Sequence, residues 1–587
     1  MKKIYYIKVF IIFIIYLSCD NHINNLESQN LHKLLNDEWD RYLFNNPELS
    51  TYIDKNSNFN HLLNDRSIAS ISQINNENIK TFKRLVQIKR SQLNKSDKLN
   101  YDLYKTNLIN YIENYSYRNF LIPLSRYEGI HIELKDLFKI MPLNTVDDLN
   151  NYLSRLKQIP LVITQTINLM KQGMKENIIP SKVSLKDVTE QINFLTNTNV
   201  SNSPFFKPIK NINIYISQEK KDSIENNSRI IIKNDIFTAF SKLENFIKDI
   251  YYPNARNEIS ILNLPNGKKY YEYLIKHYTS TSKNPSEIHK IGLNGIDSVK
   301  SEIINLMDEL NYVGTFSEFL KYMRTSKSFY YSDSEILLNK YRSTCKQVDP
   351  LLNKLFKKLP RSRYGIDEKF EKLRFQKYYY NNYKEKSYSN YFNINSSDLK
   401  MHPTYEIQVI ALKETAPGKF FQNSIVNESN YIPTFRKFLS YPSYIKGWIS
   451  YSGSLGYDMD LYNDPYSRFG QLCHSMFYYC GLVVDTGIHA FGWSRQKSID
   501  FILKNTPKIL KDIENEVDHC ITYPGNILSY KMGEKKIYDI RKNAENILKD
   551  NFDISQFHDK IIELGPLPND IFEEQIINYI KEKINTK

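Results

Sequence analysis

Apolar residues recur at three- and four-residue spacing along most of the chain, which is the period of an amphipathic helix. One such stripe follows a start at 145–148 that resembles a capping box, and it contains Val146, Leu149, Leu153 and Leu156. Pro160 is expected to break or kink that helix before a second apolar stretch that runs to Met174. A further long helix is expected over 286–310, whereas β-like runs, such as 211–216 and 230–232, are short and rare.

A segment rich in proline, lysine and tyrosine at about 358–395 is expected to be a loop-rich join between two halves of the chain. The 587 residues are enough for two lobes and a sizeable core. We therefore predict a mainly α-helical, two-lobed fold with at most a small β-sheet. Its N-terminal part is expected over 31–390 and its C-terminal part over 391–587.

The N-terminus is typical of an export signal. Lys2 and Lys3 precede an unbroken apolar run over 9–17, which is far shorter than the roughly 20 residues that a membrane-spanning helix needs. The run ends in Leu17-Ser18-Cys19, which resembles the box at which bacterial lipoproteins are cut and lipidated. The prediction is a signal peptide over 1–18 and a lipid-bearing Cys19 with a polar tether over 19–30. The alternative is an ordinary secretory signal with a chance cysteine.

The composition limits the class of protein and the kinds of partner that the chain can bind. Hydrophobic residues make up 41% of the chain, which excludes a disordered protein. The net charge of +14 is compatible with an anionic partner, but the sequence contains neither a glycine-rich phosphate loop nor zinc-finger cysteine spacing. Nucleic-acid binding is therefore not expected.

The remaining cysteines are expected to be buried free thiols. Cys473 and Cys480 lie seven residues apart in an apolar, helix-like run, so about 10 Å would separate them on a straight helix. A disulfide needs Cα atoms within about 7 Å, so these two should not bridge each other. Cys345 and Cys520 complete the set.

Candidate chemistry centres on 413–419, which reads Lys-Glu-Thr-Ala-Pro-Gly-Lys. A zinc-protease version would read His-Glu-x-x-Pro-Gly-His, in which two imidazoles hold Zn²⁺ and the glutamate takes a proton from the bound water. Lys413 and Lys419 stand where the histidines would be, and a protonated ammonium has no lone pair for a metal. Only the general base, Glu414, remains. Because positions six apart lie about 240° apart on a helix, a break at Pro417-Gly418 is expected.

Five stretches in order resemble the bacterial family called domain of unknown function 885, whose members are similar to helical zinc peptidases of the thermolysin-like superfamily. They are 413–422 (KETAPGKFFQ), 446–453 (KGWISYSG), 484–494 (VDTGIHAFGWS), 523–533 (YPGNILSYKMG) and 557–559 (FHD). The resemblance extends upstream through 278–281 and 287–292, and covers the chain from about residue 31 to the C-terminus. It implies a zincin-like fold of the gluzincin type with a central cleft.

The resemblance also implies which positions have changed. The family's metal ligands correspond to Lys413, Lys419 and Gly453, and an acid of the second motif corresponds to Lys446. We therefore expect no bound zinc and no catalytic residues, only a vestigial site. Asp485 and His489, four apart, are either a pair that orients substrate or a buried pair that holds helices together. Tyr530 is either a former oxyanion donor or a core aromatic, and His402, His474 and His519 are expected to be structural.

The sequence thus favours a lipid-anchored envelope protein that has lost peptidase activity and binds a peptide or protein partner in the old cleft. Two alternatives stay open. One is an active metallopeptidase that uses Glu414 with His474, His489 or Asp485; the other is a basic lipoprotein that binds anionic polymers or lipid. Because a partly buried carboxylate needs an opposite charge, Lys413, Lys419 or Lys446 is expected within salt-bridge reach of Glu414.

Overall fold

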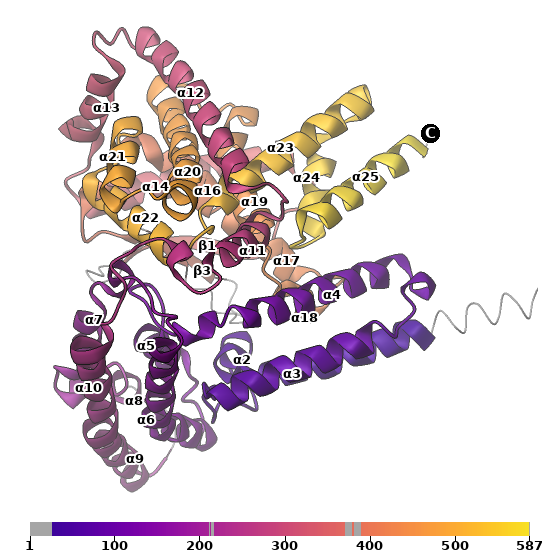
Figure 1. The fold of residues 1–587 in the computed structure, drawn as a ribbon. Helices are drawn as coiled ribbons and strands as arrows, with labels where there is room; N and C mark the ends of the chain where they lie inside the picture. The colour runs from indigo at the N-terminus through magenta and orange to yellow at the C-terminus, as the bar shows by residue number, and fades with distance from the viewer. Residues whose placement is uncertain (1–25, 211, 213–215, 370–377, 381–388, 586–587) are drawn as a thin grey trace, which may run out of the picture. The chain divides into compact units, whose positions relative to one another are not determined.

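The computed structural model describes residues 26–210, 212, 216–369, 378–380 and 389–585 (Figure 1). The expected signal peptide and Cys19 lie outside these residues, as does most of the β-like run at 211–216. The protein is mainly helical, as predicted, with one small sheet. The zincin-like part of the fold prediction stays a prediction.

Helices make up most of the described residues from 26 to 251 (Figure 1). Residues 26–45 are helical. They are followed by α2 (Pro47–Ile53), α3 (Ile68–Leu85), α4 (Lys95–Ser116), α5 (Ile130–Ile140), α6 (Val146–Lys175), α7 (Val188–Thr196), α8 (Lys207–Lys210), α9 (Gln218–Ile230), the π-helix η5 (Ile231–Ile236), α10 (Phe237–Phe246) and the π-helix η6 (Ile247–Tyr251).

The rest of the chain adds further helices and the strands. They are α11 (Gly267–Thr279), α12 (Pro285–Glu309), α13 (Phe316–Thr325), α14 (Ser334–Val348), α15 (Leu352–Leu355), β1 (Arg363–Lys369), β2 (Tyr378–Tyr380), β3 (Ser389–Asn395), α16 (Ile407–Glu414), α17 (Lys419–Glu428), α18 (Thr434–Lys437), α19 (Pro442–Asp458), α20 (Pro465–Phe491), α21 (Arg495–Asn505), α22 (Leu510–Thr522), α23 (Leu528–Leu548), α24 (Ile554–Glu563) and α25 (Asn569–Asn585).

Two sequence expectations about helices need correction. The break expected at Pro160 does not occur, because α6 continues through it while Ile159 and Ile163 stay buried in the core on either side. The β-like run at 230–232 is helical: Ile230 ends α9 and the π-helix η5 follows directly. An apolar run of three residues does not distinguish a strand from the buried face of a helix.

The predicted helix starts are confirmed. At the start of α6, Thr145 and Asp148 exchange hydrogen bonds: the Asp148 amide donates to Thr145 Oγ1 at 3.1 Å, and the Thr145 amide donates to Asp148 Oδ2 at 3.0 Å. Helix α12 begins one residue before the expected segment, at Pro285, with Asn284 and Glu287 forming a full capping box.

The chain separates into two compact units. Unit 1 comprises residues 1–123, 133–173 and 194–244, and unit 2 comprises 124–132, 174–193 and 245–587. The sequence prediction placed the division between the two parts at residue 390, which lies inside unit 2. There β3 pairs in parallel with β1 and antiparallel with β2, so the chain on both sides of residue 390 is tied into one sheet of order β1-β3-β2.

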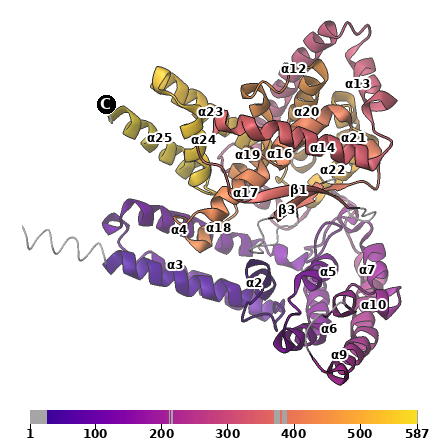
Figure 2. The same ribbon diagram turned by 180° about the vertical axis from the view of Figure 1, so that it is seen from behind.

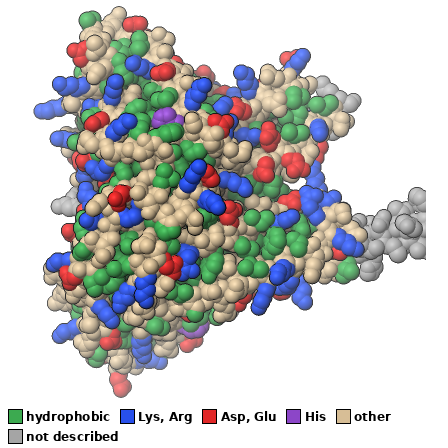
Figure 3. Space-filling model, in the orientation of Figure 1, with side chains coloured by type: hydrophobic (Ala, Val, Ile, Leu, Met, Phe, Trp, Pro, Cys, Tyr) green, Lys and Arg blue, Asp and Glu red, His purple; other side chains and the backbone are tan. Residues whose placement is uncertain are grey.

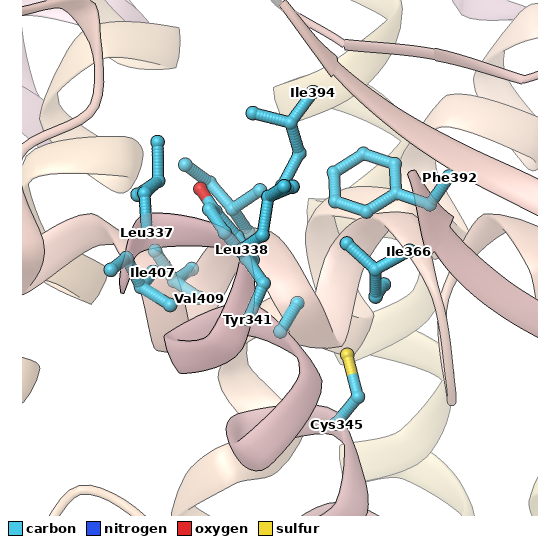
Figure 4. Packing of buried hydrophobic residues seen from close by; sticks show 11 residues of the cluster. Leu337, Leu338, Tyr341, Cys345, Ile366, Phe392, Ile394, Ile407 and Val409 are labelled. Atoms are coloured by element: carbon cyan, nitrogen blue, oxygen red, sulfur yellow. The ribbon is translucent and has the colours of Figure 1, made fainter. Parts of the chain in front are cut away.

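In unit 2 a buried apolar cluster joins the sheet to the helix that carries the candidate motif (Figure 4). Its members come from α14, β1, β3 and α16: Leu337, Leu338, Tyr341, Cys345, Ile366, Phe392, Ile394, Ile407, Val409, Ile410 and Ala411. Cys345, Cys473, Cys480 and Cys520 are all buried free thiols, as predicted. One face of α16 is thus fixed on the core while its last turn points to the candidate site.

A buried ion network closes unit 2 over long sequence distances. Arg126 donates to Asp518 at 2.9 Å and to Asp187 at 2.6 Å, and Arg495 donates to the same Asp518 at 2.6 Å. Arg126 and Asp518 are both almost fully buried. The short segments 124–132 and 174–193 are in this way attached to the C-terminal helices of unit 2.

Candidate functional site

The motif at 413–419 breaks the helix where the sequence predicted. Helix α16 ends at Glu414 and α17 starts at Lys419, with a cis Ala416–Pro417 bond between them. A Cβ on Gly418 would lie 1.9 Å from the Lys413 carbonyl oxygen, so only glycine fits the turn. The buried Trp448 indole donates to the Pro417 carbonyl at 2.9 Å and holds the turn against α19.

Lys413, the first of the three positions that the resemblance compares with metal ligands, is buried and has its own partners. Its ammonium donates to Tyr478 Oη at 2.8 Å, contacts His474 Nδ1 at 3.1 Å and lies 4.4 Å from the centre of the Tyr478 ring. Burial lowers the pKa of Lys413 to about 8. Burial, and then the neighbouring ammonium, lowers the pKa of His474 to about 3, so this imidazole is neutral and offers Nδ1 as acceptor.

Gly453, the third of the positions that the resemblance compares with metal ligands, leaves the space that the lysine occupies. A Cβ at position 453 would lie 2.9 Å from Lys413 Cγ and 3.1 Å from Val409 Cγ2. The cavity that remains between Lys413, Gly453, His474 and their neighbours measures about 10 Å³. That is room for about one water molecule. A longer side chain at 453 and the lysine stem at 413 would compete for the same volume.

The donor set at this position does not suit zinc. Of the three positions that the resemblance compares with metal ligands, two carry ammonium groups and the third has no side chain. Across the part of the chain that the structure describes, no three His, Cys, Asp or Glu side chains gather in a way that could hold a metal ion. His474 Nε2 faces Glu406 at 3.6 Å, and Glu406 itself forms an ion pair with Lys508.

The expectation that Lys413, Lys419 or Lys446 lies within salt-bridge reach of Glu414 stays a prediction. Glu414 is half-buried at the end of α16. Attraction to Glu414 raises the pKa of Lys413, against the larger effect of burial. Lys413 and Glu414 are consecutive, so their side chains leave the helix about 100° apart. Lys446 donates to Asn526.

Lys446 and the aromatic residues form a second part of the site. The Lys446 ammonium lies 4.9 Å from the centre of the Tyr530 ring, and burial lowers its pKa to about 8. Tyr530 stacks on Tyr478 with ring centres 4.5 Å apart. Burial raises the pKa of the Tyr530 hydroxyl well above its ordinary value. Lys419, half-buried, begins α17.

Asp485 and His489 form separate hydrogen bonds between elements of unit 2. Asp485 accepts the Tyr271 hydroxyl at 2.6 Å and the Gly525 amide at 2.8 Å. His489 accepts a backbone amide on Nδ1 at 3.2 Å, and its Nε2 pairs with the Cys520 carbonyl at 3.0 Å. Burial lowers the pKa of His489 to about 4, which fits a neutral ring that donates from Nε2. These contacts favour the helix-holding interpretation.

Sequence reasoning missed the partners of Lys413. Tyr478 lies four residues after His474 on α20, the spacing at which two side chains share one helix face, and this was the available signal. Glu534 accepts from Lys531 at 2.9 Å and from Ser450 at 2.7 Å beside the same small cavity. Nothing in the motif itself pointed to these groups.

A much larger groove lies beside the α16–α17 turn. Its volume is about 1050 Å³, and its apolar wall includes Ala416, Phe420 and Phe421 from the motif. The remaining lining residues come from α14, the following turns and β1: Arg342, Cys345, Lys346, Asp349, Pro350, Leu352, Leu359, Pro360, Ser362, Arg363, Tyr364, Gly365 and Ile366. In the sheet order β1-β3-β2, β1 is an edge strand.

Comparisons with known proteins place the chain among bacterial proteins. The family model described as "Bacterial protein of unknown function (DUF885)" matches residues 47–576. Two solved structures, both described as putative lipoproteins, share the fold. The one from Colwellia psychrerythraea has a TM-score of 0.85 at 21% identity and covers 96% of this chain and 99% of its own. The one from Shewanella oneidensis, of unknown function, has a TM-score of 0.73 at 15% identity, covering 94% and 99%.

No curated protein matches the chain. Within the residues that the structure describes, none of the helices combines the length and the apolar character that a membrane crossing requires.

Proposed function

We propose a function for this chain, which belongs to the bacterial family of unknown function DUF885. It is a lipid-anchored protein of the cell envelope with a metallopeptidase-like fold that hydrolyses no peptide and binds a peptide or protein partner. The lipid is carried by Cys19. The solved relatives described as lipoproteins and the cysteine box at 17–19 support the anchor.

The observation that carries the loss of catalysis is the buried ammonium of Lys413. Zinc hydrolysis needs about three protein ligands and an open position for water. Lys413 supplies a positive charge in place of a ligand, occupies the space beside Gly453 and takes up the Nδ1 lone pair of His474. His489, a second candidate ligand of the alternative enzyme, uses both ring nitrogens in backbone contacts.

Measurements of bound metal and of peptidase activity test the proposed loss of catalysis. The purified chain is expected to contain no stoichiometric zinc and to cleave no peptide. The triple variant Lys413→His, Lys419→His, Gly453→Glu provides the comparison, because it restores the three family ligands together. About one zinc per unmodified chain, lost on chelation together with peptidase activity, would establish the alternative enzyme instead.

The groove beside β1 supports the proposal that the protein binds a peptide or protein partner. An extended peptide can add to the free edge of a strand through backbone hydrogen bonds, and the side chains then enter neighbouring pockets. The groove is lined by the cations Arg342, Lys346 and Arg363 and by one acid, Asp349, and its wall is apolar. Arg342 also pairs with Glu335 at 2.8 Å, and Lys346 pairs with Asp349 at 3.1 Å. The partner that this groove fits is an extended segment with apolar and acidic side chains.

Binding of acidic and basic versions of one extended peptide tests the groove. The acidic version is expected to bind more tightly, and Arg342→Glu with Arg363→Glu should weaken it several-fold. The matched control is Lys283→Glu with Lys290→Glu, which changes the same charge on exposed residues away from the groove. Equal effects of the two double variants would show that overall charge, and not the groove, controls binding.

A further inference from the structure

One end of unit 1 is strongly basic. Residues 78–96, from the last turns of α3 through the connection to the start of α4, contain no acidic residue. They carry six basic residues, all exposed: Lys80, Lys83, Arg84, Lys89, Arg90 and Lys95. We call this set the basic end. Lysine and arginine side chains also stand out in this region of the surface in Figure 3.

The described chain starts beside the basic end. The backbone amide of Lys89 donates to the Glu27 carboxylate at 3.2 Å, which places the first turn of the 26–45 helix against the α3–α4 connection (Figures 1 and 2). Leu26 is 52% exposed and Val86, at the end of α3, is 45% exposed. Two apolar side chains thus accompany the cations at the place where the N-terminal tether joins the body.

Nearby acids offset the basic end only in part. Asp102 accepts from Arg90 at 2.7 Å, Asp37 and Glu38 each lie 3.9 Å from Arg84, and Glu27 accepts the Lys89 amide. Asp97 is buried and pairs with His32 at 2.8 Å. Six cations against these acids leave a positive surface.

We propose that the basic end docks on anionic lipid headgroups of the membrane that holds the lipidated Cys19. This proposal rests on the proposed lipid anchor. Leu26 lies seven positions after Cys19, so the chain can span at most about 25 Å between them. A basic surface held that close to a membrane lies within reach of its headgroups, and stable attachment of acylated proteins uses such a second signal beside the acyl chain.

The physical effect is orientation as well as affinity. Each Lys or Arg near an anionic surface strengthens binding roughly fivefold, and the attraction falls off within a Debye length of about 8 Å at physiological salt. The tether alone would leave unit 1 free to rotate above the membrane. When the basic end docks on the membrane, the α3–α4 connection faces the surface and the two helices extend away from it.

Vesicle binding by the chain from Asp20 to Lys587, which lacks the lipidated cysteine but contains every described residue, tests the proposal. The probes are phosphatidylcholine vesicles with and without phosphatidylglycerol. We expect binding only when phosphatidylglycerol is present, and release by salt. The variant Lys83→Gln, Lys89→Gln, Lys95→Gln should bind roughly a hundredfold more weakly, from about fivefold per charge.

A matched control removes three exposed lysines of unit 2, Lys283→Gln, Lys290→Gln and Lys321→Gln, and should bind nearly as well as the unmodified chain. Equal losses in the two triple variants, no preference for phosphatidylglycerol, or binding to heparin without binding to vesicles would each overturn the proposal. The chain in this test carries no acyl group, so its outcome is separate from that of the lipid anchor.

Discussion

Replacing Lys413 by Met tests whether the buried ammonium lowers the free energy of unfolding. Methionine has a similar length and no charge, so the space beside Gly453 stays filled while the ammonium disappears. The variant keeps the α16–α17 turn, which depends on Gly418 and Trp448. The change therefore isolates the cost of holding a proton on Lys413 inside the protein.

The pKa of Lys413 sets the magnitude. It falls from 10.5 in the unfolded chain to about 8 in the folded protein, chiefly through burial. At about 1.4 kcal/mol for each pKa unit, holding the proton below pH 8 costs about 3 kcal/mol. Tyr478 and His474 each lose a partner in the variant, at about 1 kcal/mol each. We expect Lys413→Met to be about 1–3 kcal/mol more stable than the unmodified protein at pH 7.

The sign of the pH dependence follows from proton binding. Between pH 8 and 10.5 the unfolded chain keeps the Lys413 proton while the folded protein has released it, so the unmodified protein gains stability as the pH rises. The variant lacks this gain, and its advantage should disappear by about pH 10.5. Lys446, whose pKa is also lowered to about 8, contributes equally to both proteins and cancels.

Urea unfolding at pH values from 7 to 10.5 measures the difference. Lys346→Met is the control for removing an ammonium that is not buried, because the Lys346 side chain is 83% exposed. If Lys413→Met is less stable than the unmodified protein at pH 7, or if the difference does not change with pH, the ammonium is stabilising and the reasoning fails.

Two further predictions concern the neighbouring residue and the anchor. Gly453→Ala places a Cβ 2.9 Å from Lys413 Cγ and should cost about 1–3 kcal/mol in urea unfolding. Most of that loss should be absent when the same change is made in a Lys413→Ala protein, and an unchanged loss would show that the two residues do not compete for space. Cys19→Ala should move the protein from the detergent phase to the aqueous phase on phase separation, whereas unchanged partitioning would argue against a lipid on Cys19.

Local patterns predicted the parts of the fold that local chemistry decides. The start of α6, the capped start of α12 and the break before Lys419 each depend on residues within a few positions of one another. The same reasoning failed at Pro160, where burial of Ile159 and Ile163 keeps one helix continuous. Helix propensity describes only the backbone preference of a residue, and the packing of a long helix in the core can outweigh it.

The sequence predicted where in the chain the candidate site lies, but not which side chains its residues contact. The motif drew attention to Lys413, but its partners His474 and Tyr478 lie more than sixty residues away on α20. Glu414 was expected to pair with Lys413, Lys419 or Lys446 because a partly buried carboxylate needs an opposite charge. Lys413 and Glu414 leave the helix about 100° apart, and the Lys413 ammonium donates to Tyr478.

Because the chain passes back and forth between the two units, the order in which they can fold during synthesis is constrained. The chain passes from one unit to the other after residues 123, 132, 173, 193 and 244. Arg126 enters the growing chain 392 residues before its partner Asp518, a delay of roughly 20–80 s at ordinary rates of synthesis. Until then the guanidinium that will be buried has no Asp518 to pair with. Unit 2 thus reaches its final form only when translation is almost complete, and a fragment that stops before α22 cannot close this network.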